Sequence, residues 1–398
     1  ALSSSKRVLN RLQNRKVSFD EKMHIIARGV GDDNIITMSL IFLCAGGFSG
    51  AVTAAGGVES TVNLGLSILP PSVAVAGLFV IGCFISVSMG TSMGTIAALA
   101  PIAVGISEKT GFGMPICIGA VVCGAMFGDN LSMISDTTIA AVKTQGCEMK
   151  DKFKENFIIV LPAAIITIIL FLVLTRHGSF DLGEDLHYNL WRVLPYLVVL
   201  IGALIGFNVF LVLLAGIILS LAVGVATGSI APGDIFVVVA QGADGTGGIM
   251  GMYDITVISM VVACIVSLVK EMGGIQFILN VIRSRIKGKK GGELGIAILA
   301  LLVDMCTANN TVAIVMAGPI AKEISDEFEI SPKRSASLLD MFTSVGQGLI
   351  PYGAQLLSAA SLTQLTPYAI IPYCFYPVLM AVSGLIFILF IKNRKTNE

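Results

Sequence analysis

The sequence predicts an all-α polytopic membrane protein made of two inverted-topology repeats, each containing a re-entrant helical hairpin and a broken transmembrane helix. Composition is the first observation behind this prediction. Of the 398 residues, 55% are hydrophobic and 13% are charged, and the mean hydropathy of +0.87 indicates a lipid-facing surface. The other two observations are an internal repeat and an uneven distribution of basic residues. The composition excludes an ordinary soluble domain.

The internal repeat relates MGTSMGTIAALAPIAVGIS, which starts at Met89, to CTANNTVAIVMAGPIAKEIS, which starts at Cys306. In this alignment Pro101 corresponds to Pro319, and further along the stretch FGDNLSMISDTTIAA, which ends at Ala141, corresponds to GQGLIPYGAQLLSAA, which ends at Ala360, with a one-residue shift at the shared Ala-Ala ending. Duplicated membrane halves that are interrupted at matching Gly-rich or Pro-rich positions are typical of transporters with broken helices. The repeat therefore predicts an ion-coupled membrane transporter.

Six uninterrupted apolar segments reach or approach the roughly 20 residues that a membrane-crossing helix needs. We expect each of them to cross the bilayer. They are residues 35–52, 157–174, 194–206, 209–225, 255–269 and 369–391.

Four other apolar stretches are interrupted by polar or helix-breaking residues. Residues 71–107 and 293–325 each contain a polar centre, so we expect two helical hairpins with polar tips. Residues 114–142 and 335–364 are expected to be broken helices, with interruptions at Gly128-Asp129-Asn130 and at 346–353. Non-helical backbone at membrane depth is tolerated only where protein buries it or water lines it. The alternative is that each hairpin is a pair of full crossings.

The basic residues favour the re-entrant hairpins. Counting from a cytoplasmic first residue, five segments on one side hold 23 of the 26 Lys and Arg, as the positive-inside rule requires. The 57–70 loop has no basic residue, whereas its counterpart at 274–290 has five, so corresponding loops lie on opposite faces and both chain ends are cytoplasmic. The five segments are 1–33, 143–156, 270–292, 322–334 and 392–398.

These segments divide the chain into four parts. Residues 1–34 are a basic arm, in which Phe19 to Asp33 is expected to form an interfacial helix. Repeat 1 covers residues 35–178, a connecting loop with two transmembrane helices covers 179–230, and repeat 2 covers 231–398. Because two apolar segments precede repeat 2 and none precedes repeat 1, we expect one or two further N-terminal helices in the complete protein.

The chemistry is expected at the hairpin tips and helix breaks, where free carbonyls, helix N-termini and hydroxyl or amide side chains meet. Asp129 and Asp136 are the only charged residues between Met114 and Val142, and an ionisable group at that depth indicates function. The candidate binding residues are Thr91, Ser92, Thr95, Asp129, Asn130, Ser132, Ser135, Asp136, Thr137, Thr307, Asn309, Asn310, Thr311 and Gln355, with Thr138, Gln347 and Tyr352 also considered.

Structural roles compete with these functional ones. Asn and Thr often bond neighbouring membrane helices, and Asp129 or Asp136 is suited to cap a half-helix, a role compatible with ion binding. Asp304 and Asp340 also lie within apolar runs and have no acidic counterpart in the other repeat. We keep both as candidates for lining a transport pathway.

FGDNLSMISDTT, at 127–138, resembles the FGD-x-x-S-x-x-SDTT signature of NhaC-type sodium/proton antiporters, and MGTSMGT at Met89 resembles that family's Gly-Thr-Ser tip. The architecture is similar to the ion transporter superfamily, which includes sodium-coupled dicarboxylate carriers whose Ser-Asn-Thr tips the Asn-Asn-Thr at 309–311 resembles. The resemblance covers about residues 35–391. Met133 and Asn130 depart from the family pattern, which carries proline and frequently lysine there.

The resemblance implies electrochemical exchange of Na⁺ for H⁺, with Asp129, Asp136 and Asn310 as the Na⁺ ligands. The alternative is sodium-coupled transport of a small organic solute, an amino acid or carboxylate. An intramembrane aspartyl protease is a third class, but the GxGD match that ends at Asp32 lies in the polar arm, so we expect no enzyme.

We expect a multi-pass protein of a bacterial-type cytoplasmic membrane. Its partners are membrane lipid, a small cation and, in the alternative, a small organic solute. A homodimeric scaffold fits alternating access. We expect no nucleic acid and no cofactor, with Na⁺ and H⁺ as the coupling ions.

Overall fold

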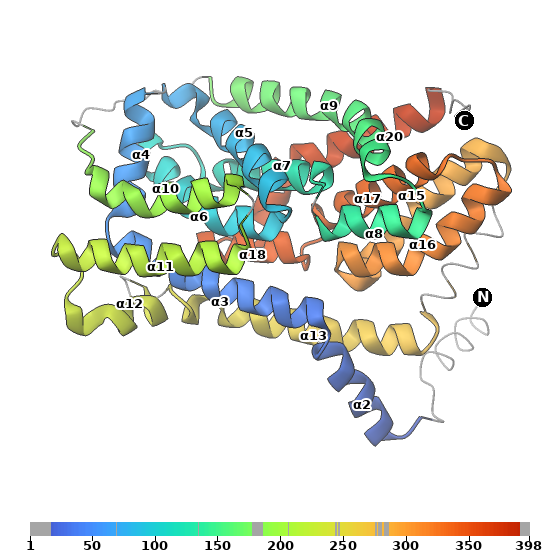
Figure 1. Ribbon diagram of the computed structural model, residues 1–398, viewed down its shortest axis with the longest axis horizontal. Helices are drawn as coiled ribbons and strands as arrows, with labels where there is room; N and C mark the ends of the chain where they lie inside the picture. The colour runs from blue at the N-terminus through green and yellow to red at the C-terminus, as the bar shows by residue number, and fades with distance from the viewer. Residues whose placement is uncertain are drawn as a thin grey trace.

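The computed structural model describes residues 17–68, 70–133, 135–176, 186–205, 207–242, 245, 247–274, 277, 281 and 286–390. This part of the chain is helical and contains no strand, as Figure 1 shows. Up to the end of repeat 1 the helices are α2 (Phe19–Val30), α3 (Asp33–Ala54), α4 (Gly57–Ile68), α5 (Pro71–Met89), α6 (Ser92–Thr110), α7 (Met114–Leu131), α8 (Asp136–Gln145) and α9 (Met149–Leu174). They continue with α10 (Leu190–Ile205), α11 (Val209–Ala226), α12 (Ile235–Gln241), α13 (Tyr253–Glu271), α15 (Gly288–Thr307), α16 (Asn310–Glu327), α17 (Pro332–Gln347), α18 (Ala354–Thr363), α19 (Pro367–Ile370) and α20 (Phe375–Phe390), with 3₁₀ turns at Pro232–Asp234, Met250–Met252 and Ile371–Tyr373.

Six helical segments of the described chain are long and apolar enough to cross a membrane, and a bent pair of helices makes a seventh. This confirms the prediction of an all-α polytopic membrane protein. The segments are Ile35–Ala54, Pro71–Met89, Met114–Gln145, Met149–Leu174, Val209–Ala226 and Met250–Glu271, and the bent pair is Pro367–Tyr373 with Phe375–Phe390.

The two repeats pack in the same way. The predicted hairpins fall on α5 with α6 and on α15 with α16, and the predicted broken helices fall on α7 with α8 and on α17 with α18. The first hairpin helix packs against the first half of the broken helix in each repeat, α5 on α7 and α15 on α17. The second hairpin helix packs against its own broken helix too, and it also contacts the other repeat, α6 against α18 and α16 against α8 (Figure 1). The hairpins and broken helices therefore form one intertwined body.

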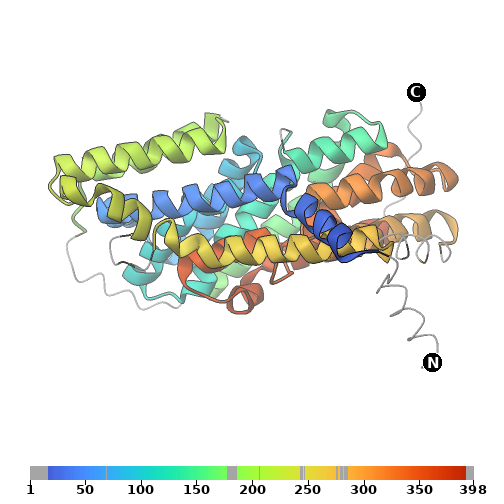
Figure 2. The same cartoon turned by 90° about the horizontal axis from the view of Figure 1, so that it is seen from below.

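A second group of helices lies beside this body. Helix α3 lies against α11 and α13, and α10 lies against α11. The predicted arm helix falls on α2, which begins after Ser18, whose side chain accepts a 3.2 Å hydrogen bond from the Glu21 amide. Helix α2 packs on α13, and α12 packs on α3 (Figure 2). The arm helix α2 and helix α12 therefore occupy equivalent positions, because each packs on the helix that follows the other one in the chain.

The break in the first broken helix lies later than predicted. Helix α7 continues through Gly128 and Asn130 and ends at Leu131, and α8 begins at Asp136. Gly128 serves close packing instead, because a Cβ there would meet the Ser86 side chain and, at 2.6 Å, the Cys83 carbonyl of α5. Gly128 was expected to interrupt the helix. It instead allows two helices to approach closely.

Two other sequence expectations need correction. The 57–70 loop is mostly helix α4, whereas its counterpart in repeat 2 lies largely outside the described residues. The single span at 369–391 is divided near Cys374, where its two parts are bent by 52°. Pro372 and Pro377 flank this bend and lack the amide hydrogens that a continuous helix would use.

Two basic residues assigned to cytoplasmic loops are buried. Lys152, in the first turn of α9, and Arg334, near the start of α17, are each 1% exposed. Arg334 donates to Glu155 at 3.3 Å and to Glu293 at 3.0 Å, and its guanidinium lies 3.8 Å from the Phe387 ring centroid. Neither residue is the solvated orientation charge that the sequence suggested, because buried acidic partners balance both.

Candidate functional site

The two hairpin tips and the two helix breaks meet around one cavity of about 140 Å³. Helix α3 closes one side of it with Thr37, Met38 and Ile41. Ten of the fourteen predicted site residues line this cavity: Thr91, Ser92, Asp129, Ser135, Asp136, Thr137, Asn309, Asn310, Thr311 and Gln355. Gln347, also considered from the sequence, joins them. The site thus combines both repeats in a way that no single segment of the chain could provide.

Asp129 is the centre of the polar network in this cavity. It lies in the last turn of α7 and is 6% exposed. Ser92, the first residue of α6, donates to Asp129 Oδ2 at 2.8 Å, and Ser135 of the break donates to Asp129 Oδ1 at 2.6 Å. Gln355 of α18 donates to Ser92 Oγ at 3.1 Å, and Thr137 lies 2.9 Å from Ser135 Oγ. Hydroxyl groups from two segments therefore contact one carboxylate, and Thr137 and Gln355 contact those hydroxyls in turn.

The charge of Asp129 has no basic partner among the residues that the structure describes. Among the described residues, its contacts within hydrogen-bond distance are the Ser92 and Ser135 hydroxyls, and no Lys, Arg or His forms an ion pair with it. A buried carboxylate without a countercharge is strongly disfavoured, so a proton or a bound cation must neutralise it. Carboxylate and hydroxyl oxygens are ligands that hard cations prefer. The arrangement suits a small cation or a proton at the same position.

Asp136 occupies a different environment. It is the first residue of α8, where a negative charge interacts favourably with the helix N-terminus. Its side chain is exposed and lines the cavity next to Ser135. The two aspartates therefore face one cavity. Asp129 belongs to a buried hydrogen-bond network, and Asp136 is exposed at the N-terminus of α8.

The second tip contributes amides to the cavity. The Asn309 side chain caps α16 by accepting a 3.0 Å hydrogen bond from the Val312 amide. Asn310 and Gln355 are 5% and 6% exposed, and Asn310 Nδ2 and Gln355 Oε1 have no hydrogen-bond partner within the described chain. Buried polar atoms are normally paired, so these two amides are available to a ligand.

Four predicted site residues brace the structure without lining the cavity. Thr95 donates to the Thr91 carbonyl at 3.0 Å, and Ser132 donates to the Val87 carbonyl at 2.7 Å. Asn130 donates to Ser344 Oγ at 3.2 Å, which ties α7 to α17. The fourth, Thr307, is described below with a neighbouring cavity.

Sequence reasoning missed Lys152 and kept Asp340 only as a candidate. Lys152 forms a buried ion pair with Asp340 and also donates to the Asn130 carbonyl at 2.8 Å and to Thr138 Oγ1 at 3.0 Å. Asn156 donates to the same carbonyl at 2.8 Å. A helix end leaves carbonyls without partners, and here α9 satisfies one of them. The sequence feature that could have revealed Lys152 and Asn156 is their i, i+4 spacing at the start of an apolar helix, which puts both on one helix face.

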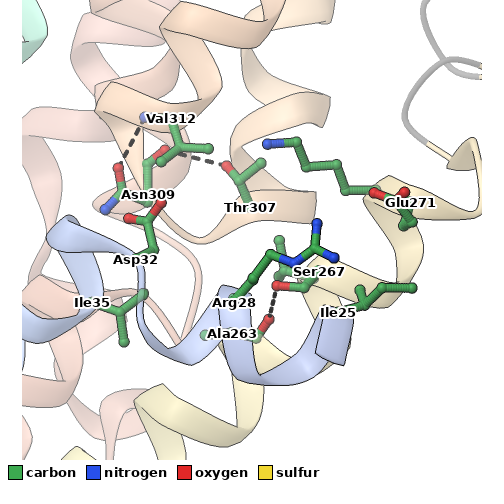
Figure 3. Close-up of a pocket in the computed structure, with 13 residues that line it drawn as sticks. Ile25, Arg28, Asp32, Ile35, Ala263, Ser267, Glu271, Thr307, Asn309 and Val312 are labelled. Atoms are coloured by element: carbon green, nitrogen blue, oxygen red, sulfur yellow. Dashed lines mark hydrogen bonds between the residues drawn. The ribbon is translucent and has the colours of Figure 1, made fainter. Parts of the chain in front are cut away.

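A neighbouring cavity of about 190 Å³ lies on the arm side of the second tip (Figure 3). Arg28 and Asp32 near the end of the arm helix, with Lys270 and Glu271 at the end of α13, line it. Thr307 and Asn309 line it too, and Asn309 also lines the central cavity. Asn309 therefore separates a charged outer cavity from the central one.

The profile of the Na⁺/H⁺ antiporter family matches the chain twice, at residues 11–176 and at residues 175–392. The chain belongs to the Na⁺/H⁺ antiporter family. The two matches meet close to the predicted boundary between the repeats, as expected if each half descends from one unit. This membership makes the protein a membrane transporter of small cations, in agreement with the sequence interpretation.

Several proteins are similar over most of their length. The "Malate-2H(+)/Na(+)-lactate antiporter" of Bacillus subtilis is 23% identical over 89% of this chain and 81% of its own. The "Na(+)/H(+) antiporter NhaC" of Alkalihalophilus pseudofirmus is 23% identical over 83% of this chain and 77% of its own, and that of B. subtilis is 25% identical over 87% and 81%. The crystal structure of the Alcanivorax borkumensis YdaH transporter is similar, with a TM-score of 0.45, 14% identity, and coverage of 94% of this chain and 89% of that chain.

Proposed function

We propose that this antiporter exchanges Na⁺ for H⁺ across the cytoplasmic membrane, and that both ions compete for Asp129. One observation carries the proposal: a buried carboxylate, bonded only to hydroxyls among the described residues, lies at the junction of both hairpin tips and both helix breaks. When Na⁺ leaves, a proton must take its place, because the uncompensated charge is too costly to bury. Competition for one carboxylate couples the two fluxes.

The residues around Asp129 have distinct roles in this proposal. Ser92 and Ser135 supply hydroxyl oxygens to Na⁺ and reorient to form hydrogen bonds with the protonated carboxyl group when Na⁺ is absent. Asp136 and Asn310, which line the same cavity, complete the coordination. Hydroxyl rotation costs little, so the same shell serves both states of the site.

Alternating access fits the packing of the helices. Because α6 contacts α18 and α16 contacts α8, the site-bearing helices are linked across the repeats and are suited to move as one unit. Helices α3, α10, α11 and α13 provide the surface against which that unit moves, and a homodimer would hold this surface fixed. With Lys152 and Arg334 set aside as buried, 21 of the remaining 24 basic residues still fall on the side predicted to be cytoplasmic, which supports the proposal that both chain ends are cytoplasmic.

A second candidate is sodium-coupled transport of a small organic solute. Two buried amide atoms without a partner in the described chain, Asn310 Nδ2 and Gln355 Oε1, favour it, since they match the polar groups of an amino acid or carboxylate. Against it stands the cavity volume of about 140 Å³, because pockets for organic ligands usually measure about 300–1,000 Å³. We therefore place ion exchange first.

Proteoliposomes with a lumenal pH dye, pulsed with Na⁺ and then with K⁺ in the absence of organic solute, test the proposal. We expect a Na⁺-specific pH change that is lost in Asp129→Asn and Asp136→Asn. The matched control is Asp326→Asn, which neutralises a surface aspartate paired with Lys322 at 3.2 Å, and it should retain exchange. No pH response in the wild-type protein overturns Na⁺/H⁺ exchange, and labelled amino acids and carboxylates then test the second candidate.

A further inference from the structure

Asp304 is a second buried carboxylate close to the site. It lies in the last turn of α15, just before the second hairpin tip, and is 0% exposed. Gln347 Nε2, from the end of α17, donates to Asp304 Oδ1 at 3.3 Å. Asp304 Oδ2 and Gln347 Oε1 are both buried and have no hydrogen-bond partner among the described residues. Two free oxygens thus lie in the interior on adjoining side chains.

The internal repeat places Asp304 at a defined position. The offset that puts Pro101 on Pro319 also puts Ser86 on Asp304. Gly128 lies against the Ser86 side chain, and Gly346 lies against the Asp304 carboxylate in the same manner, since a Cβ on either glycine would collide with its partner. The hairpin-to-broken-helix contact is therefore the same in both repeats, but repeat 2 carries a carboxylate where repeat 1 carries a hydroxyl.

The adjoining pair is also repeated. The same offset puts Ser92 on Asn310, and the aligned Gly-Asp and Gly-Gln dipeptides put Asp129 on Gln347. Repeat 1 thus has its acid on the broken helix, at Asp129, and repeat 2 has it on the hairpin, at Asp304. Each repeat places one carboxylate at the contact between its hairpin and its broken helix.

The surroundings of Asp304 supply no countercharge. The ionisable groups facing it are Cys306 on its own helix and Tyr352 from the second break, whose hydroxyl donates to the Met305 carbonyl at 2.7 Å. On α17 the nearest acid is Asp340, which Lys152 already neutralises.

The other helices that pack against α15 do not change this result. From α13, Lys270 and Glu271 reach only the outer cavity beside Thr307 (Figure 3). Helix α16 carries its first charge at Lys322, far from the tip, and the described part of α20 carries no charged residue. Within the described chain, then, nothing balances an ionised Asp304.

We infer that Asp304 and Gln347 form a second site for a monovalent coupling cation, H⁺ or Na⁺, in repeat 2. The free Asp304 Oδ2 holds the proton or coordinates the Na⁺, and Gln347 Oε1 accepts the proton's hydrogen bond or serves as a second ligand. This inference rests on the proposed exchange function and adds to it a second site at which a coupling cation binds. It differs from the Asp129 site because Asp304 does not line the central cavity, although its partner Gln347 does.

Titration calorimetry of the detergent-purified protein with Na⁺ tests the inference. Repeating the titration in buffers with different ionisation enthalpies gives both the Na⁺ bound per protein and the protons released per Na⁺. If the site takes H⁺, Asp304→Asn lowers proton release per Na⁺ by about twofold at unchanged Na⁺ stoichiometry, as linkage requires. If it takes Na⁺, Asp304→Asn binds fewer Na⁺ ions per protein. Unchanged values for both quantities overturn the site.

The controls separate this inference from the proposed function. Asp326→Asn should match the wild-type protein in both quantities. If the wild-type protein neither binds Na⁺ nor releases protons, the exchange function itself fails, whereas normal wild-type values with an unaltered Asp304→Asn variant reject only the second site.

A measurement on the wild-type protein keeps the test decisive if Asp304→Asn does not fold. A hydrophobic carbodiimide modifies protonated carboxyl groups, and mass spectrometry of the peptides identifies the modified residue. We expect modification of Asp304 that Na⁺ suppresses, directly for a Na⁺ site and through coupled proton release for a H⁺ site. Modification of Asp129 without modification of Asp304, or modification of Asp304 that Na⁺ does not affect, contradicts the inference.

Discussion

Lys152 and Asp340 form an ion pair between the two repeats, with side chains that are 1% and 0% exposed. Lys152 comes from α9 of repeat 1, and Asp340 comes from α17 of repeat 2. Because Lys152 also donates to the Asn130 carbonyl at 2.8 Å, it connects the end of α7 that carries Asp129 to Asp340 of the other repeat. The geometry of the site therefore depends on a contact that only the assembled halves provide.

Removing one partner of this pair should be costly. Lys152→Met leaves Asp340 charged and buried, and we expect the free energy of unfolding to fall by about 3–5 kcal/mol, the usual cost of breaking a buried pair. Thermal unfolding of the detergent-purified protein measures the loss.

The double variant Lys152→Met with Asp340→Leu removes both charges and should recover most of that stability. The matched control is Lys322→Met, which breaks the surface pair with Asp326 and should cost less than about 1 kcal/mol. A double variant as unstable as the single one would show that the charge itself is not the cause.

Gly128→Ala should disturb the contact between α7 and α5. The added methyl group meets the Cys83 carbonyl and the Val87 amide, both at 2.6 Å, and backbone atoms cannot move aside easily. We expect a loss of about 1–3 kcal/mol of stability from overpacking, together with weaker Na⁺ exchange because Asp129 is the next residue. Gly77→Ala in α5, where a methyl group has open space, should be neutral or slightly stabilising.

Ser92→Ala should weaken Na⁺ binding without abolishing the fold. It removes one oxygen from the proposed ion shell and one hydrogen bond to Asp129, and hydrogen bonds to charged groups contribute about 1.5–3 kcal/mol. We expect the Na⁺ concentration for half-maximal exchange to rise about tenfold or more. Ser92→Thr keeps the hydroxyl and should retain much of the affinity. Exposed Ser67→Ala is the control, and an equal effect there would exclude a specific role for Ser92.

Arg334→Lys should destabilise the protein although the charge is kept. The guanidinium bridges Glu155 and Glu293, donates to the Phe387 carbonyl at 3.1 Å and stacks on the Phe387 ring. An ammonium group has neither the planar fork nor the stacking face, so Glu293 would lose part of its buried pairing. We expect a loss of about 2–4 kcal/mol in thermal unfolding, and Lys333→Arg at the neighbouring position should change little.

The sequence alone predicted the class and the repeated architecture, because both depend on local properties. The length of an apolar segment is enough to predict a membrane-spanning helix. The alignment of Pro101 with Pro319 reveals the repeat without any knowledge of the folded structure. It also proposed Ser92, Asp129 and Ser135 as candidate site residues, since hydroxyls and an acid are costly in an apolar run unless they have partners. Their grouping in one cavity followed from the repeat.

Other features depended on contacts between distant segments. Gly128 marked a tight helix contact and not the break, and the span at 369–391 is bent at Cys374. Local sequence cannot distinguish a glycine that breaks a helix from one that admits a neighbouring helix.

The sequence alone determined that Asp129 and Asp304 each lie within an apolar segment of one repeat, because residue identity and the repeat alignment do not depend on the folded arrangement. Only the tertiary structure decided which charges are balanced. It brought Lys152 to Asp340 and left Asp129 and Asp304 without a basic partner among the described residues. The reason is that the cost of a buried charge depends on what lies within a few ångströms in space, and not on its neighbours along the chain.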